Sequence, residues 1–193
     1  MRYLFFNNEN NEQIYYQRIV NHLNKLPSAY INENSDSCDN EICLLVMQGE
    51  GAIIKPTTQY RIISTFGFGT CHCLIIYNRS NKYGFLAHLD DLTELNSLNK
   101  IYDELEIEDI SDVDIYIAGG DCNFNQTAKI YKKLELLNLH KRILGVSLHD
   151  RNIKRRISLD IYDGTTSYIL PFNYRDAHVP DIILKFRELN KIC

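Results

Sequence analysis

The sequence predicts an α+β domain in which a mixed β-sandwich core is flanked by helices. Strand-like segments gather in the middle of the chain, between helical segments at both ends. The 193 residues, 45% of them hydrophobic and 24% charged, are typical of one globular domain with a true core. This balance argues against a disordered chain, a coiled coil or a collagen-like fibre. A formal net charge of −4 makes nucleic acid and anionic membranes poor candidate partners.

The amino-terminal part of the chain differs in composition from the rest. We expect an arm over residues 1–40, rich in Asn, Glu, Ser and Tyr, before the main domain over residues 41–193. Apolar residues at helical spacing predict a helix over residues 12–25, which Pro27 ends. The polar segment 32–40 is typical of a loop.

The cysteines and the lengths of the apolar segments indicate in which cellular compartment the protein is expected. The amino terminus has too short an apolar run for a secretion signal, and no segment is long enough to span a membrane. We therefore expect the six cysteines to be free thiols in a reducing cytoplasm. A bacterial effector delivered into a host cell by a signal-free route would have the same sequence features.

The main domain begins with segments rich in Ile, Leu, Tyr and Phe that Gly, Pro and Asn interrupt, which is the pattern of strands. An apolar stripe predicts a helix over residues 125–139, with Asn125 as its N-cap. An Asp-Gly pair at 163–164 is a strong turn signal. We predict strands over 42–49, 59–65, 71–78, 83–90, 114–118 and 143–148, a hairpin over 156–169, and a last helix over 180–191.

The segment between residues 64 and 91 contains the strongest candidates for catalytic residues. Cys71 opens a strand directly after a glycine-punctuated stretch, where free backbone N–H groups can form an oxyanion hole. His88 lies on the next predicted strand, and a hairpin can bring it to the thiol, which needs a base to ionise at pH 7. Thr65 is suited to hold the imidazole in its useful tautomer.

The register of this hairpin decides which side chains share a face. A two-residue turn at 79–80 would place Cys71 opposite His88. A five-residue loop over residues 78–82 would instead place His72 opposite His88. The sequence leaves both registers open, because Arg-Ser is a poor pair for a tight hairpin turn.

These residues carry a resemblance to a known family. Thr65, Cys71 and His88 have the spacing of the catalytic triad of the CheD family of chemoreceptor glutamine deamidases. Toxins of the cytotoxic necrotising factor type use the same thiol-and-histidine chemistry. The segments reading GFGTCHCLIIYN and FLAHL resemble the nucleophile strand and the following Ala-His of CheD proteins.

A closer resemblance is to the protein N-terminal asparagine amidohydrolase family. That family carries T-C-H at the nucleophile and H-x-D after the second strand, and this chain has both, at residues 70–72 and 88–90. The resemblance covers roughly residues 42–170 and leaves out the amino-terminal arm.

The resemblance implies a CheD-like cysteine deamidase fold and an amidohydrolase that converts a protein carboxamide to an acid with release of ammonia. The expected substrate is an N-terminal asparagine; the alternative is an internal glutamine of a partner protein. Neither a metal nor an organic cofactor is required, and we expect a monomer. The implied roles are Cys71 as nucleophile, His88 as base and then acid, and Thr65 as its orienting partner. We further expect Asp90 to bind a substrate α-ammonium, because a buried cation needs a paired charge. The other expected substrate-binding residues are Gly69, Thr70, His72 and Gly120.

Two other classes remain open from the residues themselves. A zinc site is one of them, because thiolates of Cys71 and Cys73 and the imidazole of His88 or His72 are groups that bind zinc. However, C-x-C with scattered histidines is not a standard ligand pattern. A catalytically silent adaptor of the same fold is the other class, and the intact Thr-Cys-His set favours the enzyme over it. His72 itself is more typical of a buried, hydrogen-bonded histidine than of a second base.

Overall fold

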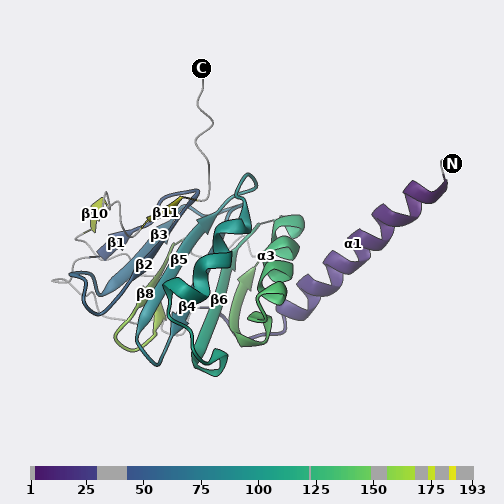
Figure 1. Ribbon diagram of the computed structural model, residues 1–193. Helices are drawn as coiled ribbons and strands as arrows, with labels where there is room; N and C mark the ends of the chain where they lie inside the picture. The colour runs from purple at the N-terminus through teal and green to yellow at the C-terminus, as the bar shows by residue number, and fades with distance from the viewer. Residues whose placement is uncertain are drawn as a thin grey trace, which may run out of the picture.

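The structure is a computed structural model that describes residues 3–29, 43–121, 123–148, 156–167, 174–176 and 183–185. Figure 1 shows three layers: a five-stranded sheet, a six-stranded sheet packed against it, and helices over the outer face of the larger sheet. This is a mixed β-sandwich flanked by helices, so the predicted fold class is confirmed. None of the described helices combines the length and the apolar character that a bilayer crossing requires.

The larger sheet has the strand order β11-β2-β5-β4-β6-β7. All of its neighbouring strands are antiparallel except β6 and β7, which run parallel because the helix α3 (Phe124–Leu136) connects them. The strands are β2 (Glu50–Ile54), β4 (His72–Asn78), β5 (Tyr83–Leu89), β6 (Val113–Gly119), β7 (Ile143–Leu148) and β11 (Ile183–Lys185).

The smaller sheet has the order β10-β1-β3-β8-β9. Its strand β1 lies parallel to both of its neighbours, whereas β8 lies antiparallel to β3 and to β9. The strands are β1 (Cys43–Leu45), β3 (Ile62–Phe66), β8 (Arg156–Asp160), β9 (Thr166–Ser167) and β10 (Tyr174–Asp176).

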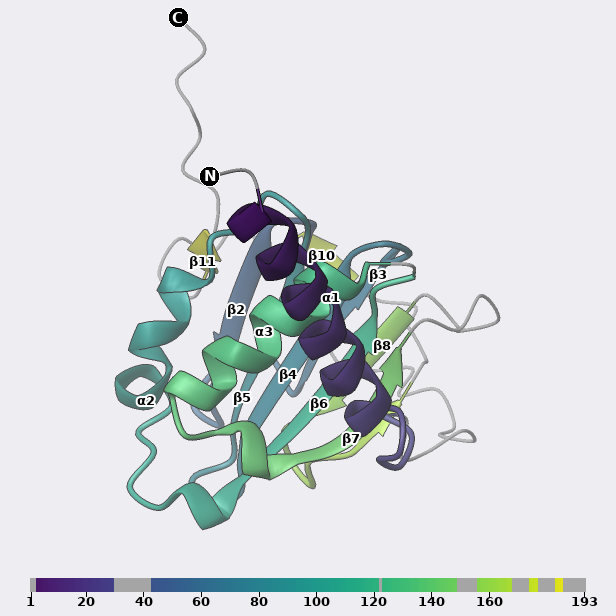
Figure 2. The same cartoon turned by 90° about the vertical axis from the view of Figure 1, so that its right-hand side faces the viewer.

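The helices cover the larger sheet, as Figure 2 shows. The carboxy-terminal half of α1 belongs to the helix-side core, because Ile19 and Leu23 are buried in it, and α1 packs against α3. The amino-terminal half of α1 projects beyond the sandwich (Figure 1). The helices are α1 (Tyr3–Leu23), η1 (Leu95–Lys100), α2 (Ile101–Glu104), η2 (Ile110–Asp112), α3 (Phe124–Leu136) and η3 (His140–Arg142).

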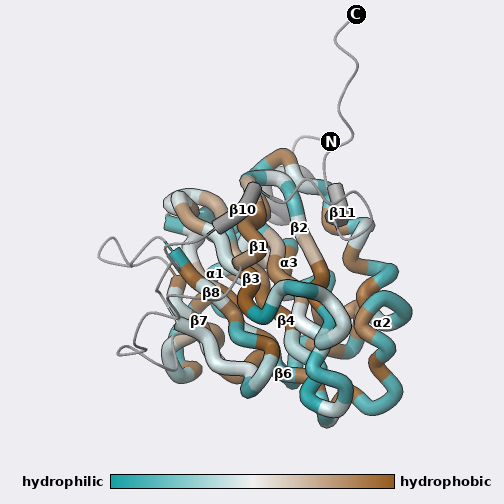
Figure 3. The backbone as a smooth tube through the Cα atoms, turned by 90° about the vertical axis from the view of Figure 1, so that its left-hand side faces the viewer, coloured by the Kyte–Doolittle hydropathy of each residue, from teal (hydrophilic) through white to brown (hydrophobic). Residues whose placement is uncertain are grey.

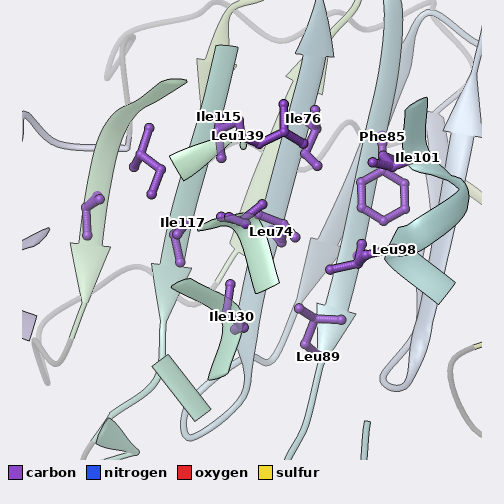
Figure 4. Packing of buried hydrophobic residues seen from close by; sticks show 14 of the residues in the cluster. Leu74, Ile76, Phe85, Leu89, Leu98, Ile101, Ile115, Ile117, Ile130 and Leu139 are labelled. Carbon is purple, nitrogen blue, oxygen red and sulfur yellow. The ribbon is translucent and has the colours of Figure 1, made fainter. Parts of the chain in front are cut away.

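Side chains alternate between the two faces of β4 and so contribute to two cores. Leu74 and Ile76 face the helices, where they join Phe85 of β5 (Figure 4). Cys73 and Ile75 face the smaller sheet. Because β4 is buried on both faces, it reads as an almost continuous apolar run. In Figure 3 hydrophobic residues, in brown, gather along the strands of the sandwich, whereas teal, hydrophilic residues are frequent around α2.

Two of the described connections pass between the two sheets at one end of the sandwich, which we call the crossover end. Residues 46–49 lead from β1 to β2, and residues 67–71 lead from β3 to β4. The strands β5 and β6 also end there, because His72 pairs with Leu89 on one side and with Gly119 on the other. The amino terminus of α3 follows β6 at this same end.

Most predicted elements are present, and the differences have physical causes. The strand β2 has no predicted counterpart, since its Gly-Ala sequence lacks strand propensity. The N-cap of α3 is Asn123, whose side-chain oxygen accepts from the backbone N–H of Gln126 at 3.2 Å, so the assignment of Asn125 is wrong. The predicted last helix is wrong over Ile183–Lys185, which pairs as strand β11 with β2.

Several predicted segments lie outside the described residues. They are the loop over residues 32–40 and the remainder of the last helix over 180–191. The predicted first helix is present as α1, which begins nine residues before the predicted start at residue 12.

Candidate active site

Two side chains from opposite sheets meet inside the sandwich at the crossover end. Thr65, near the end of β3, places its Oγ1 2.9 Å from Nδ1 of His88 on β5. Both side chains are buried, with exposed fractions of 0% and 3%. The hydrogen bond expected from the sequence between the threonine and the imidazole is therefore present.

The partners of Thr65 determine the tautomer of His88. The hydroxyl of Thr65 donates to the carbonyl oxygen of Val46 at 2.8 Å. Because its single proton is used there, Oγ1 is left to accept from Nδ1–H of His88. Nε2 of the neutral ring then carries a lone pair, and it has no hydrogen-bond partner within the described part of the chain. The sequence did not indicate Val46, since a backbone carbonyl leaves no side-chain signal.

Burial also sets the charge of this imidazole. Removal from water disfavours the protonated ring and lowers the pKa of His88 from 6.5 to about 4. Phe68, itself 1% exposed, lies edge-on to the imidazole with the ring centroids 6.3 Å apart, and forms part of this dry environment. At neutral pH the ring is therefore an uncharged base.

The hairpin that carries His88 has a register that differs from both predicted ones. Asn78 pairs with Tyr83, so the loop has four residues and Cys73, rather than Cys71 or His72, lies opposite His88. Both predicted registers are therefore wrong. Asx-type hydrogen bonds hold the loop, with Asn78 Oδ1 accepting from the Ser80 N–H at 3.1 Å and Asn81 Oδ1 from the Tyr83 N–H at 3.0 Å.

The observed register nevertheless keeps Cys71 on the side of His88. Cys73 faces the smaller sheet beside His88, and Cys71 precedes it by two residues, the repeat of one strand face. Cys71 lies just before β4, is half-buried and packs against the core between the sheets. It is thus a partly accessible thiol next to the dry space that holds His88.

Two glycines support the loop that carries Cys71. Gly119 and Gly120 adopt left-handed φ values of 93° and 71°. A Cβ on Gly119 would lie 2.4 Å from the carbonyl oxygen of Cys71, so only glycine allows this approach. The N–H of Gly120 donates to that same carbonyl at 2.8 Å, and the N–H of Asp121 donates to the carbonyl of Gly69 at 2.9 Å.

Asn123 connects three segments around the same loop. Its side-chain amide donates to the carbonyl of Thr70 at 3.3 Å and to the carboxylate of Asp91, while its oxygen caps α3. The sequence reasoning missed this residue, although an Asn shortly before an apolar helix is a recognisable N-cap signal. Thr70 itself is exposed and Gly69 is half-buried, so the segment directly before Cys71 is accessible to solvent.

The predicted substrate residue His72 lies on the other side of the sheet. Its side chain is fully buried toward the helices, and its Nε2 lies 2.8 Å from Oγ1 of Thr127 on α3. A Cβ on Gly120 would approach that same ring nitrogen to 2.1 Å. The ring of His72 therefore lies on the helix side of β4, whereas Cys73 and Ile75 face the smaller sheet.

Asp90 is a buried carboxylate at the end of β5, with 5% of its surface exposed. One oxygen accepts from Nε2 of Gln48 at 2.9 Å, and the other from the hydroxyl of Thr93 at 2.8 Å. The loop that carries Gln48 is also hydrogen-bonded to β5, since the N–H of Gly49 donates to the carbonyl of His88 at 2.8 Å. These contacts fix the carboxyl group of Asp90 two residues from His88, and the sequence did not indicate the contribution of Gln48.

The remaining described thiols are poorly suited to nucleophilic chemistry. Burial raises the pKa of Cys73 well above its ordinary value and raises the pKa of Cys43 to about 12. Both stay protonated at neutral pH, which leaves Cys71 as the accessible thiol of the described residues. Within those residues, no group of three or more His, Cys, Asp or Glu side chains is arranged to hold a metal ion.

Comparison with known protein families gives a match over most of the chain. The family model described as protein N-terminal asparagine amidohydrolase matches residues 33–163. No curated protein matches the sequence.

Similar solved structures are more distant. One is a Neisseria meningitidis protein of the DUF152 family, 11% identical over 69% of this chain and 67% of that one, with a TM-score of 0.31. Another is YlmD from Geobacillus stearothermophilus, 8% identical over 65% of this chain and 62% of that one, with a TM-score of 0.33. This chain thus spans about two thirds of the length of those proteins.

Proposed function

The chain belongs to the protein N-terminal asparagine amidohydrolase family, and from this premise we propose that Cys71 and His88 hydrolyse the side-chain amide of an N-terminal asparagine. The observation that carries the proposal is the chain of contacts from the Val46 carbonyl through Thr65 to His88. It leaves Nε2 as a buried, neutral base, and Cys71 packs against the same core between the sheets.

The first half of the reaction forms a thioester. Nε2 of His88 takes the proton from Sγ of Cys71, and Sγ bonds to the amide carbon of the substrate. The negative charge that develops on the amide oxygen is stabilised by backbone N–H groups of the 67–71 loop. The C–N bond then breaks, and His88 returns its proton to the departing nitrogen, which leaves as ammonia.

The second half releases the acid. Nε2 of His88 takes a proton from a water molecule, whose oxygen attacks the thioester carbon. The C–S bond breaks and the proton returns to Sγ, so the enzyme is restored and the substrate carries an aspartate. The imidazolium exists only between these transfers, and the oxygen of Thr65 stabilises it at Nδ1.

Asp90 supports a preference for a terminal residue over an internal one. A free amino terminus brings an α-ammonium close to the reacting side chain, and a buried cation requires a paired charge. Asp90 supplies a carboxylate that Gln48 and Thr93 hold in place at the same end of the sandwich. An internal glutamine would bring no such cation.

Ammonia release and product mass distinguish the alternatives. Wild type and Cys71→Ala are incubated with a peptide that begins with asparagine, with its acetylated form, and with an internal-glutamine peptide. We expect turnover of the free-amine peptide alone and no turnover by the variant. Turnover of the glutamine peptide instead, or equal turnover by Cys71→Ala, would refute the proposal, and silence on all three would favour the adaptor.

A further inference from the structure

The crossover end carries exposed apolar side chains that the proposed chemistry does not use. Met47, Phe66, Leu92 and Phe124 are 51%, 44%, 74% and 39% exposed. We call these four residues the apolar rim. They come from four separate segments: the β1–β2 crossover, the end of β3, the loop after β5 and the start of α3.

Three rim residues follow residues of the site along the chain. Phe66 follows Thr65, and Met47 follows Val46, whose carbonyl accepts from the Thr65 hydroxyl. Leu92 lies two residues after Asp90, and its own N–H donates to that carboxylate at 3.1 Å. Along these segments the chain runs from a buried site residue to an exposed apolar one, so the rim lies at the same end of the sandwich as the site.

Phe124 joins the rim through the hydrogen bonds of its neighbour. Asn123 binds the carbonyl of Thr70 in the loop before Cys71 and the carboxylate of Asp91, which precedes Leu92. The amino terminus of α3 is thereby tied to both the nucleophile loop and the segment after β5.

We propose that the apolar rim binds the residues that follow the N-terminal asparagine of the substrate, and that the enzyme prefers an apolar second residue. This inference rests on the proposed function. A terminal asparagine in a protein is always followed by chain. With its side chain at Cys71 and its α-ammonium at Asp90, that chain leaves the site at the crossover end, where the rim lies. Apolar surface there is buried against an apolar second residue, which stabilises the bound complex.

The charges beside the rim favour the same occupant. Asp91 and Glu94 are exposed in the segment that carries Leu92, and Glu50 follows the segment that carries Met47. These carboxylates attract the cationic amino terminus and repel an acidic second residue. Discrimination of this kind is commonly tenfold or more for one side chain in an apolar pocket.

The test compares peptides that differ only at the second residue: Asn-Leu, Asn-Ala and Asn-Asp. For the wild type we expect kcat/KM for Asn-Leu to exceed that for Asn-Asp about tenfold. The difference lies in KM, because the rim contacts a part of the substrate remote from the reacting amide. In the double variant Phe66→Ser/Leu92→Ser the ratio falls to within about twofold.

A matched control separates the rim from general surface effects. Leu136, 82% exposed at the far end of α3, loses the same kind of surface in Leu136→Ser, and this variant keeps the wild-type preference. Equal kcat/KM for the three peptides in wild type, or an unchanged preference in the rim double variant, would overturn the inference. So would a wild-type dimer that the rim substitutions dissociate, because the rim would then be an interface between two copies.

Binding distinguishes failure of the rim from failure of the proposed chemistry. Fluorescence anisotropy with Cys71→Ala reports affinity for the same labelled peptides without turnover. Tighter binding of Asn-Leu than Asn-Asp together with no turnover by wild type would refute the proposed reaction and support the rim. Turnover of all three peptides with no difference in affinity would refute the rim and leave the reaction standing.

Discussion

Burial of His88 makes the stability of the protein depend on pH, by an amount that follows from the structure. The pKa of His88 is about 4 in the folded protein, where burial disfavours the cation, whereas the unfolded chain has the ordinary value of about 6.5. Between these values the unfolded state binds a proton that the folded state does not. Stability is therefore full above about pH 6.5 and falls as the pH drops toward 4.

The expected loss is about 2 kcal/mol between pH 7.5 and pH 5, and it approaches about 3.4 kcal/mol below pH 4. Urea unfolding of wild type and of His88→Gln at both pH values measures it. Glutamine keeps a polar side chain beside Thr65 but does not titrate, so the contributions of all other groups cancel in the comparison. Wild type should lose about 2 kcal/mol more than the variant on going to pH 5.

An equal loss in the two proteins would refute the reasoning. His88 would then have the same pKa in the folded and unfolded states, and the description of a dry, neutral base would fall with it. The same pKa predicts that kcat/KM stays high down to about pH 5 and falls only near pH 4, whereas an ordinary histidine would give a fall near pH 6.5.

Three further predictions follow from contacts in and beside the site. Thr65→Val removes the acceptor for Nδ1–H and should lower kcat about 100-fold, whereas Thr65→Ser should stay within about fivefold. Gly120→Ala should lower the free energy of unfolding, measured with urea, by about 3 kcal/mol, because the added Cβ would clash with the ring of His72. Gly67→Ala, with a similar φ but open space around it, should cost about 1 kcal/mol; equal costs would contradict the steric argument. Asp90→Asn should raise KM for a free-amine peptide about tenfold with little change in kcat, and an unchanged KM would remove Asp90 as the ammonium ligand.

The sequence predicted the layers of the fold because the strands carry strong signals. The apolar run of β4 and the helical stripe of α3 are unambiguous in composition and period. Composition and hydrophobic period could not predict the register of the β4–β5 hairpin. It depends on side-chain hydrogen bonds of Asn78 and Asn81 and on a left-handed φ of 62° at Lys82, a conformation that lysine rarely adopts.

For the candidate site too, the sequence predicted some features, whereas others depend on tertiary contacts. Cys71, His88 and Thr65 could be proposed from residue type and spacing, and the hydrogen bond between the last two is present. The sequence did not show which face of the sheet each side chain occupies. His72 was therefore expected to bind substrate together with Cys71, although its ring lies toward the helices. The contributions of Val46 and Asn123 depend on tertiary contacts between segments distant in sequence, which local patterns do not report.

Trapping of the covalent intermediate tests the central claim most directly. Wild-type enzyme is mixed with a peptide that begins with asparagine, quenched with acid within the first turnover, digested and analysed by mass spectrometry. We expect the fragment that contains Cys71 to gain the mass of the peptide less ammonia, and Cys71→Ala to gain nothing. Product that accumulates without this adduct, or an adduct on another residue, would contradict Cys71 as the nucleophile.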